Sequence, residues 1–431
     1  MHSTPPVRPG TNDKRGCMIA LIVGGIGVAL LIAAVVGGVF VLPMLNPSSE
    51  AVLSKKLAAA PKLTEEMKPK LMDFAEDLIS EISNGDMAAV NTFCDYEALA
   101  ARVFEGVEAG GLTGIQLRQG FLSSIEKQGY FSEIADADLR PLRVIERDGF
   151  PAVTLRILPS SGGVNYIDLL IWQNEDAFKV IDMHTYLYGS LSSTDTRDML
   201  AAVLAGSDQQ AFAKILGISG ENVKELVAAV QTLNEKAQAG DQEGLVEAYR
   251  GFPVEVQKLR LPFMRYLTAL QQLNSAGANE DHAAAYREAI QKAPTVFGTD
   301  ATTDLLLVDE LLLRESYDAA IETVNRVDET IGGDPYLHVL RGWIFFQKGQ
   351  MADVMRCIAL ADQEEPELVA VVDLKLSYHA KTQDYAALVQ ELKDFQVRFG
   401  TRLGRAELSQ EAQYEEFLKS DEFAAYEKQG E

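Results

Sequence analysis

The chain has 431 residues, of which 47% are hydrophobic, and a formal net charge of −24 at pH 7. This length and apolar content allow two or three folded domains. The acidic balance argues against a nucleic-acid partner, because binding to phosphates needs a basic surface, and its ordinary role is to keep a protein in solution.

The first sixteen residues are polar and include Arg8, Lys14 and Arg15, and no charged residue then occurs from Cys17 to Ser49. We expect a cytoplasmic tail over 1–16 and a transmembrane helix over 17–43, since about 20 apolar residues span a bilayer. A cleaved signal peptide is the alternative, with a shorter apolar run of roughly 7–15 residues. Basic residues before the span predict an inner-membrane protein whose body is periplasmic or otherwise extracytoplasmic.

Four small residues recur at every fourth position of this predicted span: Gly25, Ala29, Ala33 and Gly37. Small residues on one helix face let two helices pack closely in a membrane. This spacing would allow a homodimer, and the alternative is a passive tether, since glycine and alanine are common in membrane spans. A short stalk is expected over 44–61.

Residues 62–195 change from helical to strand-like patterning. Helical spacing of apolar residues predicts helices over 67–83, from about 87 to 105, and over 115–127. Alternating apolar residues then predict strands over 139–147, 152–158, 164–173 and 178–188. This order of elements resembles the cone-shaped NTF2-like fold, which implies an α+β domain with a four-stranded antiparallel sheet.

The last two predicted strands carry polar and aromatic residues. Strand alternation places Asp182, His184 and Tyr186 on one face with Phe178, Val180 and Tyr188. Tyr166 and Asp168 alternate in the same way with Leu170 and Trp172 on the preceding strand. By resemblance to enzymes of the NTF2-like group, these side chains form a ligand pocket or an acid–base pocket, and packing is the alternative.

From residue 196 the chain is helical, and one pattern recurs near its end. Tyr317, Met351 and Tyr385 are 34 residues apart, each within a similar segment. Such a period with two amphipathic helices per unit predicts a helical solenoid over 196–402. The aromatic and acidic segment 403–431 predicts a capping helix.

The best unit is Pro335–Leu368, and it has small or turn residues at the spacing of the tetratricopeptide repeat (TPR) family: Gly342, Gly349, Ala361 and Pro366. Weaker units are expected over about 263–296 and 226–259. The resemblance implies that the first helix of each unit lines a concave groove. The residues carried over to that groove are Leu305, Asp309, Tyr336, Val339, Trp343 and Phe346.

This groove implies a protein or peptide partner that presents an apolar segment. The alternative is that the chain's own C-terminal helix covers Trp343 and Phe346. The sequence contains no phosphate-binding loop, HExxH motif, GxSxG motif or metal-ligand cluster, so we expect no enzyme activity, no cofactor and no metal.

Three cysteines, Cys17, Cys94 and Cys357, form no CxxC pair. Cys94 and Cys357 fit apolar helical patterns, where a free cysteine behaves as a small hydrophobe, and a bridge between them in an oxidising compartment is the alternative. The leading hypothesis is a single-pass membrane scaffold or adaptor. The second is a ligand-binding or enzymatic middle domain with the repeats as a dimerisation or docking platform.

Overall fold

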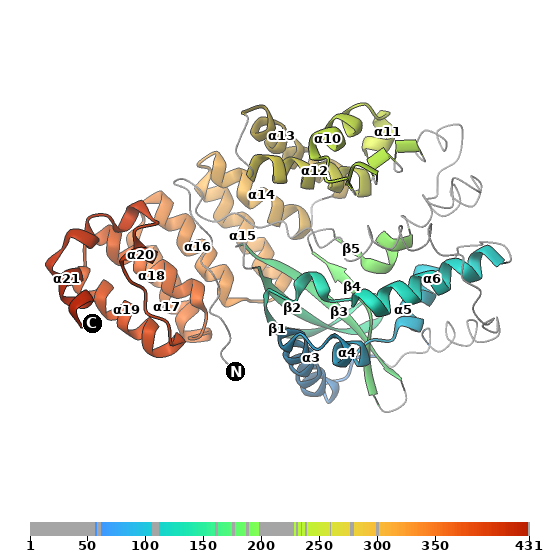
Figure 1. Ribbon diagram of the computed structural model, residues 1–431, viewed down its shortest axis with the longest axis horizontal. Helices are drawn as coiled ribbons and strands as arrows, with labels where there is room; N and C mark the ends of the chain where they lie inside the picture. The colour runs from blue at the N-terminus through green and yellow to red at the C-terminus, as the bar shows by residue number, and fades with distance from the viewer. Residues whose placement is uncertain are drawn as a thin grey trace. The chain divides into compact units, whose positions relative to one another are not determined.

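The computed structural model describes most of the chain from residue 62 onward (Figure 1). The described residues are 57, 62–105, 112–159, 163–174, 177–186, 189–197, 228–229, 232–233, 235–237, 239–258, 260–275, 280–298 and 301–429. They form two compact units. The sheet unit comprises the described residues before 160 and those of Val164–Thr303, and the helical unit those of Asp304–Glu431.

The sheet unit is built on five antiparallel strands in the order β1-β2-β3-β4-β5. Their bounds are β1 Asp138–Arg147, β2 Phe150–Leu158, β3 Asn165–Asn174, β4 Ala177–Thr185 and β5 Ser190–Leu191. The first four confirm the predicted strands, and the two-residue β5 was not predicted. Asp148 and Gly149 join β1 to β2 with φ angles of 52° and 78°, which a tight hairpin turn requires.

Four helices bury one face of this sheet: α3 Met67–Asn84, α4 Met87–Thr92, α5 Tyr96–Val103 and α6 Leu112–Gln128. Their apolar side chains share a core with one face of the strands, including Leu71, Leu78, Phe121, Leu155 and Leu169. This arrangement confirms an α+β region with an antiparallel sheet.

The helix predicted from about 87 to 105 is two helices. Asp95 interrupts it, because its carboxylate accepts a hydrogen bond from the Ala98 backbone amide at 2.9 Å and caps α5. The backbone at the break also pairs with β4, since Val180 donates to the Phe93 carbonyl and Asp95 donates to the Val180 carbonyl. The break therefore holds the helices to the edge of the sheet.

The sheet unit also contains a second group of helices: α10 Gln242–Arg250, α11 Val254–Gln257, α12 Arg260–Ser275 and α13 Glu280–Phe297. α12 and α13 pack against each other, and α10 packs on α12. The sequence assigned this segment to the repeats, and the boundary at residue 195 remains a prediction.

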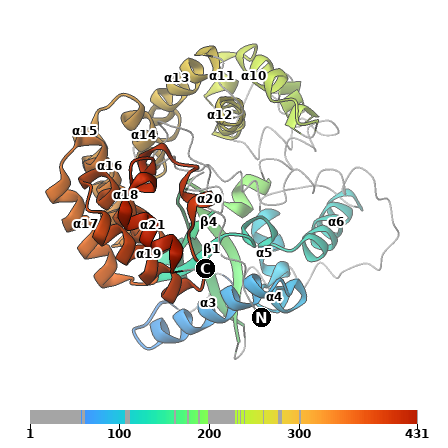
Figure 2. The same cartoon turned by 60° about the vertical axis from the view of Figure 1, so that its left-hand side comes forward.

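The helical unit contains three successive helix pairs (Figures 1 and 2). The pairs are α14 Ala301–Leu313 with α15 Tyr317–Ile331, α16 Pro335–Lys348 with α17 Met351–Glu364, and α18 Val369–Thr382 with α19 Tyr385–Phe399. The three residues spaced by 34, Tyr317, Met351 and Tyr385, are each the first residue of the second helix in a pair. α16 contacts α15, α17 and α18, so neighbouring pairs share one core.

Close packing at Gly342 fixes the position of α16. A Cβ atom at this position would lie 2.4 Å from Leu374 Cδ2 on α18 and 3.3 Å from Cys357 Cβ on α17. The tightest approach is therefore to the next helix pair and not within its own pair. Glycine at this position lets three helices meet.

The C-terminal segment covers the last helix pair with α20 Arg405–Leu408, η2 Ala412–Tyr414, η3 Phe417–Lys419 and α21 Asp421–Lys428. Tyr414, Phe417 and Phe423 join a buried cluster with Leu376 and Leu392. Two arginines hold the segment: Arg402 lies over the Tyr426 ring at 4.5 Å and Arg405 over the Phe423 ring at 4.7 Å. We call residues 403–429 the cap.

The predicted membrane helix over 17–43, with Gly25, Ala29, Ala33 and Gly37, lies outside the described residues. Within the part of the chain that the structure describes, no helix has both the length and the apolar character needed to cross a bilayer.

Candidate functional site

The predicted polar pocket lies on the face of the sheet opposite the helix-covered core, but its residue set differs from the expected one. Tyr166, Asp168, Leu170 and Trp172 alternate along β3 as predicted, and Asp168 and Leu170 pair with His184 and Asp182. A register shift follows, because Ile171 pairs with Val180. Phe178 and Val180 consequently join the helix-covered core, while Ile181 packs with Leu170 and Trp172 on the other face.

Asp168 is fully buried and accepts hydrogen bonds from two side chains. Thr154 Oγ1 donates to it at 2.7 Å, and Arg147 Nε donates to its other oxygen. Arg147 also donates to the Tyr186 hydroxyl at 3.0 Å and lies over the Tyr186 ring. Asp168, Arg147 and Tyr186 therefore form one ion-paired group on the sheet.

Asp182 is likewise fully buried, and four donors surround it. They are Arg102 Nε at 2.8 Å, the Ser193 hydroxyl at 2.5 Å, the Ser193 amide at 3.1 Å and the Met183 amide at 2.8 Å. The oxygens of this buried carboxylate are therefore occupied by hydrogen bonds, one of them from a charged guanidinium. The group links α5 to β4 and to the helical residues that follow β5.

His184 lies beside this network with its ring 5.2 Å from the Tyr186 ring. Burial, together with the positive charge of Arg147, lowers the pKa of His184 to about 3. The imidazole is therefore neutral at pH 7. The predicted residues come together, but both carboxylates are enclosed and ion-paired, which suits holding the sheet together better than acid–base chemistry.

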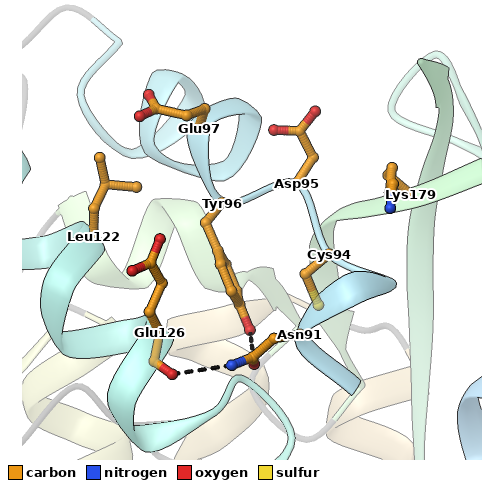
Figure 3. A pocket seen from close by; sticks show the side chains of 8 residues that line it. All are labelled: Asn91, Cys94, Asp95, Tyr96, Glu97, Leu122, Glu126 and Lys179. Carbon is orange, nitrogen blue, oxygen red and sulfur yellow. Dashed lines mark hydrogen bonds between the residues drawn. The ribbon is translucent and has the colours of Figure 1, made fainter. Parts of the chain in front are cut away.

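A surface pocket of about 540 Å³ lies elsewhere in the sheet unit, at the break between α4 and α5 (Figure 3). Its lining residues are Asn91, Cys94, Asp95, Tyr96, Glu97, Leu122, Glu126 and Lys179. None of them was a predicted site residue. The pocket depends on the helix break, and the sequence signal for that break was Asp95, a helix-capping residue type before an apolar run.

The floor of this pocket is internally hydrogen-bonded. The Tyr96 hydroxyl donates to Asn91 Oδ1 at 2.6 Å, and Asn91 Nδ2 donates to the Glu126 carbonyl at 3.0 Å. In Figure 3 the Cys94 sulfur points toward the same asparagine. Burial raises the pKa of the Cys94 thiol to about 12, so the thiol stays protonated and is a poor nucleophile near neutral pH.

The predicted groove residues of the helical unit divide into two sets. Leu305, Asp309 and Val339 are buried. Tyr336, Trp343 and Phe346 on α16 are partly exposed, and the Trp343 and Phe346 rings meet edge to face at 5.6 Å. We call these last three residues the α16 strip.

The contacts of the cap indicate whether the C-terminal segment covers the α16 strip. The cluster includes residues of α18 and α19, and no residue of α16 is among its described members. Gln413 Nε2 of the cap also donates to Ser377 Oγ on α18 at 3.1 Å. Ser377 is 34 residues after Trp343, so the cap contacts the repeat position that Trp343 occupies one pair earlier.

Among the described residues, no group of three or more histidine, cysteine, aspartate or glutamate side chains could hold a metal ion. No protein-family model, curated protein or solved structure matches the chain.

Proposed function

We propose that this protein is a single-pass membrane-anchored scaffold or adaptor that binds a protein partner through TPR-like helix pairs. The spacing of 34 residues between the second helices of successive pairs supports the TPR-like assignment. The antiparallel sheet with helices on one face supports an NTF2-like middle domain as a second module. On this proposal the anchor is the charge-free segment 17–43 and the helix pairs lie outside the cytoplasm.

The observation that carries the proposal is the α16 strip. Trp343 and Phe346 are large aromatic side chains that remain partly exposed, while the equivalent position on α18 is covered by the cap. Aromatic side chains in a groove are the residues that most often dominate the binding energy of an interface. A partner segment that covers the strip would bury them as the cap buries its own aromatics.

Capture from detergent-solubilised membranes tests this function, with the wild-type chain compared with Trp343→Ala. We expect a retained partner to be lost with Trp343→Ala and kept with Leu360→Ala. Leu360 is a matched control because it is an exposed apolar residue on α17. Equal capture by both variants would show that the strip is not the binding surface.

The anchor is tested separately by adding protease to spheroplasts. We expect digestion of the chain beyond about residue 50 with the membrane segment retained. A protected body, or a mature chain that begins after Leu42, would contradict the topology.

A second candidate function rests on the pocket at the α4–α5 break. Its volume of about 540 Å³ is within the range of small-molecule sites. A fragment screen by NMR on the full chain tests it, with binding expected to perturb Lys179 and Leu122. If the NMR signals that change are instead spread evenly over the surface, the pocket is not a ligand-binding site.

A further inference from the structure

We infer that the partner segment which binds the α16 strip is a basic amphipathic helix, with apolar residues on one face and lysine or arginine along its edges. The inference rests on the proposed function and specifies the chemistry of the partner. Three features of the helical unit support it: the way the cap occupies the neighbouring position, the ion pairing of the lysine and arginine residues on α16 and α18, and the net charge of the unit.

The cap shows which kind of segment packs against this face of the helix pairs. Tyr414 packs into the buried cluster beside α18, and Gln413 donates to Ser377 Oγ. The Phe417 ring then lies 5.5 Å from the Tyr385 ring on α19. The occupant of the last pair is therefore a short helical segment with aromatic anchors and a polar contact to Ser377. A site on α16 that continues this face suits an occupant of the same kind.

The lysine and arginine side chains of α16 and α18 are largely neutralised within the helical unit. Arg341 Nη2 lies 2.7 Å from Asp328 and Lys375 Nζ lies 3.0 Å from Asp362. Lys348 Nζ lies 2.5 Å from Asp318. Lys381 lies exposed at the end of α18.

The rest of the helical unit is acidic. Residues 304–431 contain 26 aspartates and glutamates against 13 lysines and arginines, a net charge of −13. The resulting potential attracts a basic segment and repels an acidic one. The α16 strip supplies apolar contact area. The acidic residues around it favour a partner segment with positive charge.

Tryptophan fluorescence allows a direct test, because the chain has two tryptophans. Trp172 is buried on β3, so a Trp172→Phe chain reports Trp343 alone. The probes are three helical peptides of about five turns, roughly 18 residues each. One is built of lysine and leucine with one apolar face, the second of glutamate and leucine with the same face, and the third of lysine and serine without an apolar face.

We expect the lysine–leucine peptide to protect Trp343 from acrylamide quenching in a saturable manner, with weaker binding as salt rises. In fluorescence anisotropy its affinity for Trp343→Ala should fall about 10-fold or more, and its affinity for Leu360→Ala should be unchanged. Melting curves of both variants should match the wild-type curve, which shows that the helix pairs remain folded.

Three results would overturn the inference. If the glutamate–leucine peptide protects Trp343 as well as its lysine counterpart, the groove binds apolar segments without regard to charge, and the proposed function stands. If the lysine–leucine peptide binds Trp343→Ala as tightly as wild type, or if no peptide protects Trp343, a basic helix is not the occupant. The capture experiment with membrane extracts then decides the proposed function independently.

Discussion

The two units of this protein place their ion pairs differently. In the sheet unit Asp182 pairs with Arg102, 80 residues earlier, and both Asp182 and Asp168 are fully buried. In the helical unit Arg341 pairs with Asp328 and Lys375 with Asp362, and the second pair repeats the first after 34 residues. The sheet unit thus depends on a few long-range buried pairs, and the helical unit on a local pair that recurs with the repeat.

This comparison predicts which substitutions in each unit lower the free energy of unfolding most. A buried carboxylate that loses its partner leaves an uncompensated charge, whereas a partly exposed pair contributes little. Each unit contains one tryptophan, Trp172 in the sheet unit and Trp343 in the helical unit. Unfolding of the two units can therefore be followed separately in single-tryptophan chains.

The largest effect is expected in the sheet unit for Arg102→Met. Removing this guanidinium leaves Asp182 buried without its cation and should lower the free energy of unfolding by about 3–5 kcal/mol. Urea denaturation followed through Trp172 measures it. Arg118→Met is the matched control, because its partner Glu97 is 51% exposed and such pairs contribute about 0–1 kcal/mol. Equal losses in the two variants would mean that the burial of Asp182 does not decide the cost of losing its partner.

Gly342→Leu is expected to be the most damaging single change in the helical unit. The new side chain would overlap Leu374, which is fully buried, and overpacking of this kind typically costs about 1–3 kcal/mol and occasionally more. Denaturation followed through Trp343 should show early unfolding of the helical unit alone. Gln347→Leu, at an exposed position of the same helix, should change stability little. A stable Gly342→Leu chain would mean that α16 can move away from α18.

His184 should make the sheet unit sensitive to mild acid. Its pKa falls from 6.5 to about 3 on folding, so below pH 6.5 the unfolded chain binds a proton that the folded chain does not. This linkage should lower the free energy of unfolding by about 2 kcal/mol at pH 5. In His184→Gln the Trp172 transition should lose that part of its pH dependence. An unchanged pH profile would mean that His184 stays protonable in the fold.

The smallest effects are expected from the repeated ion pair. Arg341→Met and Lys375→Met should each cost about 0.5–1 kcal/mol, because these pairs are only partly buried. Denaturation through Trp343 measures both. Arg356→Met, which affects a pair between neighbouring turns of one helix, is the control and should cost less. Losses above about 3 kcal/mol would show that the helical unit also depends on buried charge.

The sequence predicted the helical unit well because its information is local. Tyr317, Met351 and Tyr385 mark helix starts, and each follows a short polar turn that any pair of helices in this register needs. Gly349 was placed correctly at one such turn, where its φ of 78° favours glycine. The same local reasoning predicted the groove positions, yet Val339 is buried, because spacing alone does not tell which neighbouring helix covers a residue.

The sheet unit was predicted less completely, because its strand register and its ion pairs depend on residues that are far apart in the sequence. Simple alternation placed Phe178 and Val180 with Asp182, and the register shift opposite Ile171 separates them. A bulge of this kind has no reliable sequence signal. The ion pair between Arg102 and Asp182, and the pocket beside Cys94, both require knowing that the α4–α5 break pairs with β4. The residues proposed for a pocket are close together, but their roles follow from partners that the strand pattern did not reveal.

The most direct test of the central claim is site-specific photocrosslinking in cells. A photoreactive amino acid is placed at position 343 on the α16 strip or, as the control, at position 360 on α17. If the strip binds a protein partner, illumination should give a discrete adduct of higher mass from position 343 and none from position 360. No adduct from position 343, or the same adduct from both positions, would contradict partner binding through this groove.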